Sequence, residues 1–403
     1  MDFVCQQDVV SRVDLSRAVG EIIARFESRL PACDALILLK PNLNNDLSAL
    51  TGNSTDLRLL AALIEALQQR GYTHIVVGDG PNVGTHRKGV DILARLGVRA
   101  LCAHYGVECV DLNQSPTTQV QVATGPVHVS RVCLEADYVI SLPKIKTHAE
   151  AGLSCAVKNL MGCVAGTDKR LMHADLTANL VRLNEAVKPH LILVDGLIGM
   201  EGNGPGDGKP RRLDLLLAGT DAFLLDLRVA RLVGLDWSQI PYLRVAHQRR
   251  RIGDEAVAQV NAMEPLAHIE PAPPRGLVAR VLDHRWLQNV RDLTRPIHGS
   301  ETARRWLYRL GIMQDVYEQA EARIERLWLD LSRCDRCGVC LDYCPLQLPI
   351  LEAGFDFASP CIQCLYCVQA CPQEAIQVDG ELGYLKRHLA RYGDLTRRAT
   401  QWQ

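Results

Sequence analysis

Eight of the fifteen cysteines in this 403-residue chain lie in two short runs near its C-terminal end. Each run has the spacing C-x2-C-x2-C-x3-C-P, and the second repeats the first 27 residues later. Three closely spaced thiols can surround one small centre, but a fourth so near in sequence points away from it. The runs are Cys334, Cys337, Cys340, Cys344 and Pro345, then Cys361, Cys364, Cys367, Cys371 and Pro372.

This spacing is typical of bacterial ferredoxins with two cubane clusters, in which the last cysteine of each run binds the cluster of the other run. It predicts two [4Fe–4S] clusters and a small α+β ferredoxin-like domain. One cluster would be held by Cys334, Cys337, Cys340 and Cys371, and the other by Cys361, Cys364, Cys367 and Cys344.

Zinc and disulfides are the alternatives for these thiols. Two zinc sites would favour paired C-x2-C hooks with a longer spacer between them. Disulfides need an oxidising compartment, and residues 1–6 lack the cationic start and apolar core of a secretory signal. We therefore expect iron ligands in a cytoplasmic protein, with the seven scattered cysteines mostly buried and reduced.

Composition excludes few functions. The chain is 47% hydrophobic and 23% charged, with a net charge of −1, which is ordinary for a soluble globular protein. Such a balance predicts no nucleic-acid partner. No apolar stretch reaches the roughly 18 residues of a membrane span, so none is expected.

Length and pattern predict four segments. They are an α/β domain at 1–239, a helical connector at 240–330, the ferredoxin-like domain at 331–380 and a basic, helical tail at 381–403. Pro271 to Pro274 is a stiff break. Within the connector, an arginine-rich stretch at 304–310 and an apolar stripe at 324, 327, 328 and 331 predict amphipathic helices. These would pack on the main domain or dock an acidic redox partner or a membrane face.

The N-terminal segment alternates short apolar runs with helical patterns. Buried-strand runs occur at 35–39, 74–77, 107–112, 138–140, 191–194 and 215–217. Helical patterns occupy 57–67 and 176–187, and another follows residue 221. Continuous rather than alternating apolar strands predict a mostly parallel sheet covered by helices on both faces.

Polar residues follow these strands repeatedly. The carboxyl ends of parallel strands share one edge, where ligands bind. Any single such residue is often only part of a turn, but several together predict a shared site. The residues concerned are Lys40, Asn42, Asp79, Lys144, Lys146, His148, Asp195 and Asp221.

The stretch from 142 to 162 is the densest in such residues. It carries Lys144, Lys146 and Lys158, which could bind carboxylate or phosphate oxygens, and Ser154 is a candidate helix cap beside them. The alternative is a solvated basic loop with a packed histidine. A nucleotide-binding turn at 78–84 is disfavoured because the G-x-G-x-x-G spacing is absent. The glycine-rich stretch at 201–209 predicts a mobile loop, either a lid or a plain connector.

An ordered set of short motifs between residues 35 and 235 resembles the DUF362 family. Many members resemble this chain in carrying a ferredoxin-like module, so the resemblance implies an iron–sulfur protein with this architecture. It implies no particular substrate. The motifs lie at 40–42, 77–79, 143–148, 157–162, 195–196, 201–205 and 218–221.

These observations predict an iron–sulfur oxidoreductase component that passes electrons from a redox partner protein to a small anionic substrate or cofactor. His148 is the candidate proton donor, assisted by Lys146, while Asp79 and Asp195 orient it or bind a cation. The remaining candidate ligand contacts are Lys40, Asn42, Lys144, Lys158 and Asn159. The alternatives are a non-catalytic carrier that docks on an enzyme and a redox sensor or assembly factor.

Overall fold

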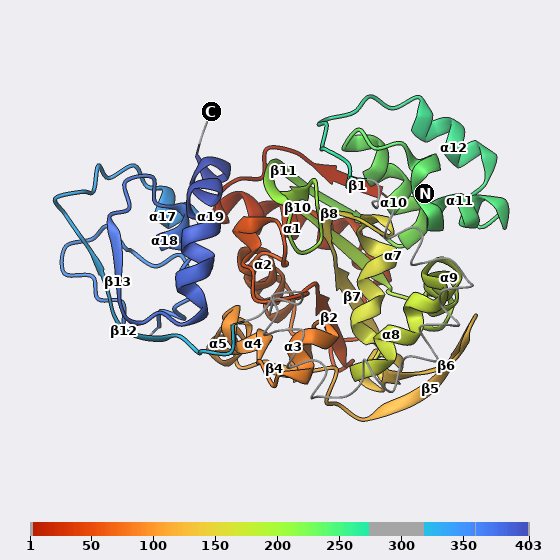
Figure 1. Cartoon of the computed structure of the whole chain (residues 1–403), viewed down its shortest axis with the longest axis horizontal. Helices are drawn as coiled ribbons and strands as arrows, with labels where there is room; N and C mark the ends of the chain where they lie inside the picture. Colours follow the sequence, from red (N-terminus) through yellow and green to blue (C-terminus); the bar gives the residue numbers. More distant parts are fainter. Residues whose placement is uncertain (1–2, 274–317, 359, 402–403) are drawn as a thin grey trace, which may run out of the picture.

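The computed structural model describes residues 3–273, 318–358 and 360–401. Its larger part is a nine-stranded sheet in the order β1-β11-β10-β7-β2-β3-β4, with β8 and β9 branching from β10 (Figure 1). The strands are β1 Phe3–Gln6, β2 Ile37–Pro41, β3 Ile75–Asp79, β4 Glu108–Asp111, β7 Tyr138–Leu142, β8 Lys144–His148, β9 Gly152–Ser154, β10 Leu191–Glu201 and β11 Lys209–Gly219.

The centre of this sheet is parallel, as predicted. Strands β7, β2, β3 and β4 pair in parallel, and β10 is parallel to β7 and β8. The antiparallel pairs are β1 with β11, β10 with β11, and β8 with β9. A separate hairpin, β5 Thr117–Val122 with β6 Gly125–Ser130, lies beside the sheet.

Helices cover both faces of the sheet because neighbouring strand residues point to opposite sides. In β2, Ile37 and Leu39 join one buried cluster with α1 and α2, whereas Leu38 joins another with α9 and α10. The helices of this domain are α1 Arg12–Arg25, α2 Leu57–Gln68, α3 Val83–Arg87, α4 Ile92–Arg95, α5 Val98–Tyr105, α6 Val132–Glu135, α7 Ala156–Asn159, α8 Lys169–Met172, α9 Leu176–Ala186, α10 Ala222–Leu232, α11 Pro241–Gln248 and α12 Asp254–Asn261.

The C-terminal module is small and lies against the α/β domain (Figure 1). It contains β12 Arg323–Leu329, α17 Val339–Asp342, α18 Tyr366–Ala370 and β13 Ile376–Glu381. The tail forms α19 Tyr384–Thr400, a helix as predicted, which contacts both α18 and β11. This helix therefore joins the module to the main sheet.

The apolar stripe predicted as a helix at 324–331 is instead strand β12, paired antiparallel with β13. The register shifts between Ile324 and Arg326, so a bulge is present. A bulge brings two residues three apart to the same face of a strand. Ile324 and Leu327 therefore share a face of β12, as residues three apart also do on a helix. The arginine-rich stretch at 304–310 lies outside the described residues.

Three local predictions are wrong. Ser154 ends β9 and caps nothing; the first N–H groups of α7, from Ala156 and Val157, donate to the Asp226 carboxylate at 2.7 and 3.0 Å. Asp195 lies inside β10, which continues six residues farther, to Glu201. Asp221 caps α10 at the opposite edge of the sheet, because β11 runs antiparallel to β10.

Candidate functional site

A cavity of about 540 Å³ opens where β2, β3 and β8 end, on the predicted edge. It brings together six of the predicted site residues, four that follow strands and two from α7. Those lining it are Asn42, Asp79, Lys146, His148, Lys158 and Asn159.

Asp79, which lines the cavity, forms a buried ion pair with Lys40 of the neighbouring strand. Lys40 Nζ lies 2.7 Å from Asp79 Oδ1 and 3.3 Å from Asn159 Oδ1. Asp79 Oδ2 also accepts the Leu43 N–H at 2.7 Å. Burial disfavours the charged form of Lys40, but Asp79 outweighs this and raises the pKa of the lysine. Lys40 is therefore a fixed cation that positions Asp79 and Asn159.

Two predicted residues lie apart from the cavity. Lys144 and Asp195 form their own pair, with Nζ–Oδ distances of 3.0 and 2.9 Å, and both side chains are fully buried. Neither lines the cavity, because β8 and β10 pair side by side at these two residues. Asp195 also accepts the Asp56 N–H at 2.7 Å, so the pair ties the sheet to the start of α2.

Lys146 is the most buried cation on the cavity wall, at 1% exposure. Its Nζ lies 2.7 Å from Asn42 Oδ1 and 2.7 Å from the Asn53 carbonyl oxygen. Burial lowers its pKa to about 7, and the nearby Lys158 charge contributes. Its charge is thus poorly compensated at neutral pH.

Lys158 and Lys169 extend this positive surface. Burial lowers the pKa of each to about 8, opposed by Glu150 at Lys158 and by Asp79 at Lys169. Within the described residues, the Lys158 ammonium has no hydrogen-bond acceptor. An anion in the cavity would supply the missing negative charge.

His148 is held in one tautomer. Its Nδ1 accepts N–H groups from Glu150 and Ala151, both at 3.1 Å. An imidazole nitrogen that accepts hydrogen bonds carries no proton, so the ring proton is on Nε2. His148 can therefore donate a hydrogen bond as a neutral ring.

Sequence reasoning missed several residues of the cavity. Lys169 and Arg170 follow no strand and come from α8, while Gly206 comes from the glycine-rich loop between β10 and β11. That loop was predicted as a lid or a connector, and it lies at the cavity. Ser154, predicted only as a helix cap, also lines the cavity. The missed lining residues that carry polar side chains are Asn44, Asn45, Asn82, Lys169, Arg170 and His173.

Gly162 is required beside the Lys40–Asp79 pair. A methyl group there would collide with Asp79 Oδ1 and approach Lys40 Nζ to 2.6 Å. We expect Gly162→Ala to lower the free energy of unfolding by about 1–3 kcal/mol, measured by urea denaturation. Gly206→Ala is the matched control, because its methyl group meets open space and should change stability little. Equal losses in both variants would contradict this account.

The cysteines of the C-terminal module gather in two groups. A cavity is lined by Cys334, Cys337, Cys340 and Cys371, three from the first run and the last of the second. Burial raises the pKa values of Cys361 and Cys364, and both of these thiols interact electrostatically with Cys344. The structure thus brings together the two crossed sets that the spacing predicts.

The backbone of the module repeats as well. Left-handed residues recur at the same positions of both runs: Arg336 and Gln363, Gly338 and Leu365, Gln347 and Glu374. Backbone N–H groups also approach sulfur, from Leu348 to Cys344 Sγ at 3.4 Å and from Ala375 to Cys371 Sγ at 3.2 Å. N–H groups directed at sulfur favour thiolate ligands, so the donor set fits an iron–sulfur cluster. In the described ranges, no three His, Cys, Asp or Glu side chains are placed around a single metal ion.

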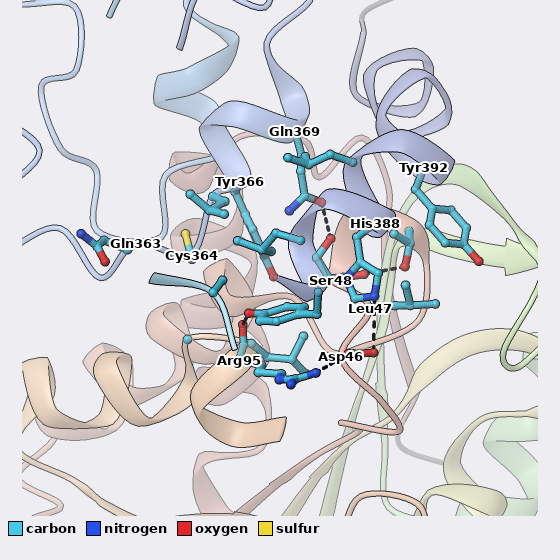
Figure 2. Close-up of a pocket in the computed structure, with 18 of the residues that line it drawn as sticks. Asp46, Leu47, Ser48, Arg95, Gln363, Cys364, Tyr366, Gln369, His388 and Tyr392 are labelled. Atoms are coloured by element: carbon cyan, nitrogen blue, oxygen red, sulfur yellow. Dashed lines mark hydrogen bonds and ion pairs between the residues drawn. The ribbon is translucent and has the colours of Figure 1, made fainter. Parts of the chain in front are cut away.

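The two groups of thiols differ in exposure. Cys337, in the group with Cys334, Cys340 and Cys371, is exposed. In the other group, Cys364 lies against Gly97, where an added Cβ would come within 3.4 Å of Cys364 Cβ. Cys364 also lines a cavity of about 190 Å³ at the domain boundary (Figure 2). We refer to the two sets as the outer and the inner thiols.

Polar contacts seal this boundary. Figure 2 shows Asp46 between Arg95 and His388, at 2.9 and 3.5 Å. The Ser48 hydroxyl donates a hydrogen bond to Gln369 Oε1 at 2.5 Å. These contacts join the C-terminal module to the α/β domain.

Two short segments join the boundary to the strand-edge cavity. In the first, Asn44 and Asn45 line the strand-edge cavity and Asp46 lines the boundary cavity. In the second, the Asn53 carbonyl accepts from Lys146, and the Leu57 N–H donates to the Tyr366 hydroxyl at 3.2 Å. Tyr366 follows Cys364 by two residues, so a path of covalent and hydrogen bonds leads from Cys364 through residues 53–57 to Lys146.

Comparison with known proteins agrees with both parts. Residues 37–231 match DUF362, described as a domain of unknown function. The chain is 33% identical over 255 residues to the thylakoid-associated protein sll1697 of Synechocystis sp., covering 60% of this chain and 74% of that protein. The chain belongs to the DUF362 family. Residues 326–379 match a 4Fe-4S dicluster domain. This DUF362 protein therefore carries a ferredoxin-type module that binds [4Fe–4S] clusters and serves electron transfer.

Two solved structures resemble this DUF362 protein at low identity. The lactate racemase apoprotein from Thermoanaerobacterium thermosaccharolyticum has a TM-score of 0.38 and 13% identity, covering 61% of this chain and 56% of that one. A protein from Thermotoga maritima has a TM-score of 0.31 and 14% identity, covering 52% and 56%. The chain thus spans just over half the length of each, and neither similarity identifies an activity. Among the described helices, none is long and apolar enough to cross a membrane.

Proposed function

We propose that this DUF362 protein is an oxidoreductase component with two [4Fe–4S] clusters in its C-terminal module and a site for a small anion at the strand edge. The observation that carries the proposal is the hydrogen-bonded segment from Tyr366 to Lys146, which joins the inner thiols to the cavity. Such clusters supply single electrons at potentials tuned by hydrogen bonds and burial. The protein's own residues supply ligand binding, protons and docking.

The outer thiols mark the side on which a redox partner docks. Cys337 is the one cluster cysteine of the described residues that is exposed, while Cys364 of the inner set lies against Gly97 of the α/β domain. A partner that approaches the module at Cys337 therefore meets the outer thiols first. The inner set, Cys344, Cys361, Cys364 and Cys367, would then pass electrons toward the α/β domain.

Ligand binding rests on the cations of the cavity. Lys146 and Lys158 carry no ion pair in the described parts of the chain, and Arg170 lines the same wall. A carboxylate or phosphate placed there gains charge-assisted hydrogen bonds from groups already held in position. The group of this ligand that accepts electrons would then lie beside lysines that release protons near neutral pH.

His148 is assigned a narrower role. Its Nδ1 is occupied by two backbone N–H groups, so the ring donates a hydrogen bond from Nε2 as a neutral imidazole. The protons that reduction consumes are better supplied by Lys146 and Lys158, with pKa values of about 7 and 8. The histidine then orients the ligand.

Anion binding should weaken as pH rises. An anion binds the protonated lysines, so its affinity is greatest below their pKa values of about 7 and 8 and falls above them. We expect the affinity for inorganic phosphate or succinate to drop at least about tenfold between pH 6.5 and 9, measured by calorimetry under anaerobic conditions. Lys158→Met should abolish binding, whereas Lys188→Met, at an exposed position, should not. Affinity independent of both pH and Lys158 would contradict the anion site.

The carrier alternative makes a different prediction. A carrier that only docks on an enzyme keeps electron transfer when cavity residues are lost. In the oxidoreductase proposed here, a Lys146→Ala, His148→Ala double variant should retain the iron content and spectrum of the wild type and lose turnover in the native pathway. Unchanged turnover would favour the carrier.

A further inference from the structure

The three lysines of β2 and β8 are all buried but differ in their partners. Lys40 contacts Asp79 at 2.7 Å, and Lys144 contacts Asp195 at 2.9 Å. Lys146, two residues after Lys144, has only neutral oxygen partners in the described residues. Two of these side chains are therefore held as ammonium ions by carboxylates, and the third is not.

The partners of Lys146 suit a neutral amine. A primary amine has two N–H groups and one lone pair. At Lys146, the oxygen of Asn42 and the carbonyl of Asn53 can accept both N–H groups. The lone pair is then left for a third direction, and the side chain lines the strand-edge cavity.

The electrostatic surroundings favour the same state. Burial and the neighbouring Lys158 charge lower the pKa of Lys146 to about 7, so a large fraction is unprotonated at neutral pH. Desolvation together with a nearby cation is one way in which proteins activate a lysine as a nucleophile. Lys40 and Lys144 lack this combination because each has a carboxylate beside it.

We propose that Lys146 forms an imine with the carbonyl group of a small oxo acid bound in the strand-edge cavity. This rests on the proposed anion site, since Lys158 and Arg170 would hold the carboxylate of the oxo acid while its carbonyl carbon meets Lys146 Nζ. The substrate class is thereby narrowed from anions in general to carboxylic acids that carry a ketone or aldehyde.

The chemistry balances without an added oxidant or reductant. Lys146 Nζ attacks the carbonyl carbon, and the C–O double bond becomes a C–N double bond. The oxygen leaves as water with two hydrogens, and a proton for its departure comes from the Lys158 or Lys169 ammonium in the same cavity. A protonated imine keeps one N–H, which Asn42 Oδ1 or the Asn53 carbonyl can accept.

Reductive trapping tests this directly. The full-length protein, purified without air, is incubated at pH 7 with pyruvate and cyanoborohydride, and its peptides are mapped by mass spectrometry. We expect a carboxyethyl group on Lys146 at a rate at least about tenfold above that on exposed Lys188, because the neutral fraction of an amine rises tenfold per pKa unit. Lys40 and Lys144, buried and ion-paired, should stay unmodified.

Controls separate this inference from the anion site. Succinate has no ketone or aldehyde group and should slow the labelling of Lys146 by competition, while leaving Lys188 unaffected. Labelling of Lys146 no faster than of Lys188, in a protein that still binds succinate, would overturn the imine and leave the anion site standing. Absence of succinate binding together with absence of labelling would remove both.

Discussion

A Cys371→Ser variant is expected to lose the same iron–sulfur cluster as a Cys334→Ser variant, although 371 belongs to the second cysteine run. The reason is spatial: Cys371 lines one cavity with Cys334, Cys337 and Cys340. Four thiolates hold each cluster, so each substitution should remove one of the two clusters. Each variant should therefore retain about half of the iron and sulfide of the wild type. Iron and sulfide analysis with electron paramagnetic resonance of the reduced protein would measure this.

The inner set provides the matched comparison. Cys344→Ser should behave like Cys361→Ser. The thiol of Cys344 lies close enough to interact electrostatically with those of Cys361 and Cys364, so all three would bind the same cluster. The two pairs of variants should therefore leave two different residual spectra. If Cys371→Ser instead left the same spectrum as Cys361→Ser, each run would hold its own cluster and the crossed arrangement would be wrong.

An Asp195→Asn variant should strongly destabilise the α/β domain. Burial raises the pKa of Asp195, and the adjacent Lys144 ammonium only partly offsets this. Removing the carboxylate leaves the fully buried Lys144 without its ion-pair partner, which costs about 3–5 kcal/mol of unfolding free energy. Urea denaturation of the anaerobic protein would measure the loss.

Two controls distinguish this from a general effect of charge removal. A Lys144→Met, Asp195→Asn double variant should recover most of the lost stability, because neither charge of this pair then remains. Glu185→Ala removes a pair with Arg182 in which both side chains are about half exposed, and should cost less than about 1 kcal/mol. A double variant less stable than Asp195→Asn would contradict the role given to the pair.

Sequence reasoning identified part of the site and misplaced the rest, for definable reasons. Lys40, Asn42 and Asp79 converge because the parallel strands β2 and β3 end at a common edge. Asp221 does not join them because β11 reverses direction, and a short apolar run does not reveal the direction of its strand. Lys169 was missed because α8 follows no strand and reaches the cavity through packing alone.

The cysteine spacing and the apolar runs were sufficient, by themselves, to predict a ferredoxin-like module, a mostly parallel sheet and a charged strand edge. These are local patterns, and local patterns dictate chemistry and element type. Tertiary structure alone decided which lysines are paired, because Lys40 and Lys144 find carboxylates 39 and 51 residues away while Lys146 finds only carbonyl oxygens. Partners so distant in sequence are set by strand order and register, which no local pattern records.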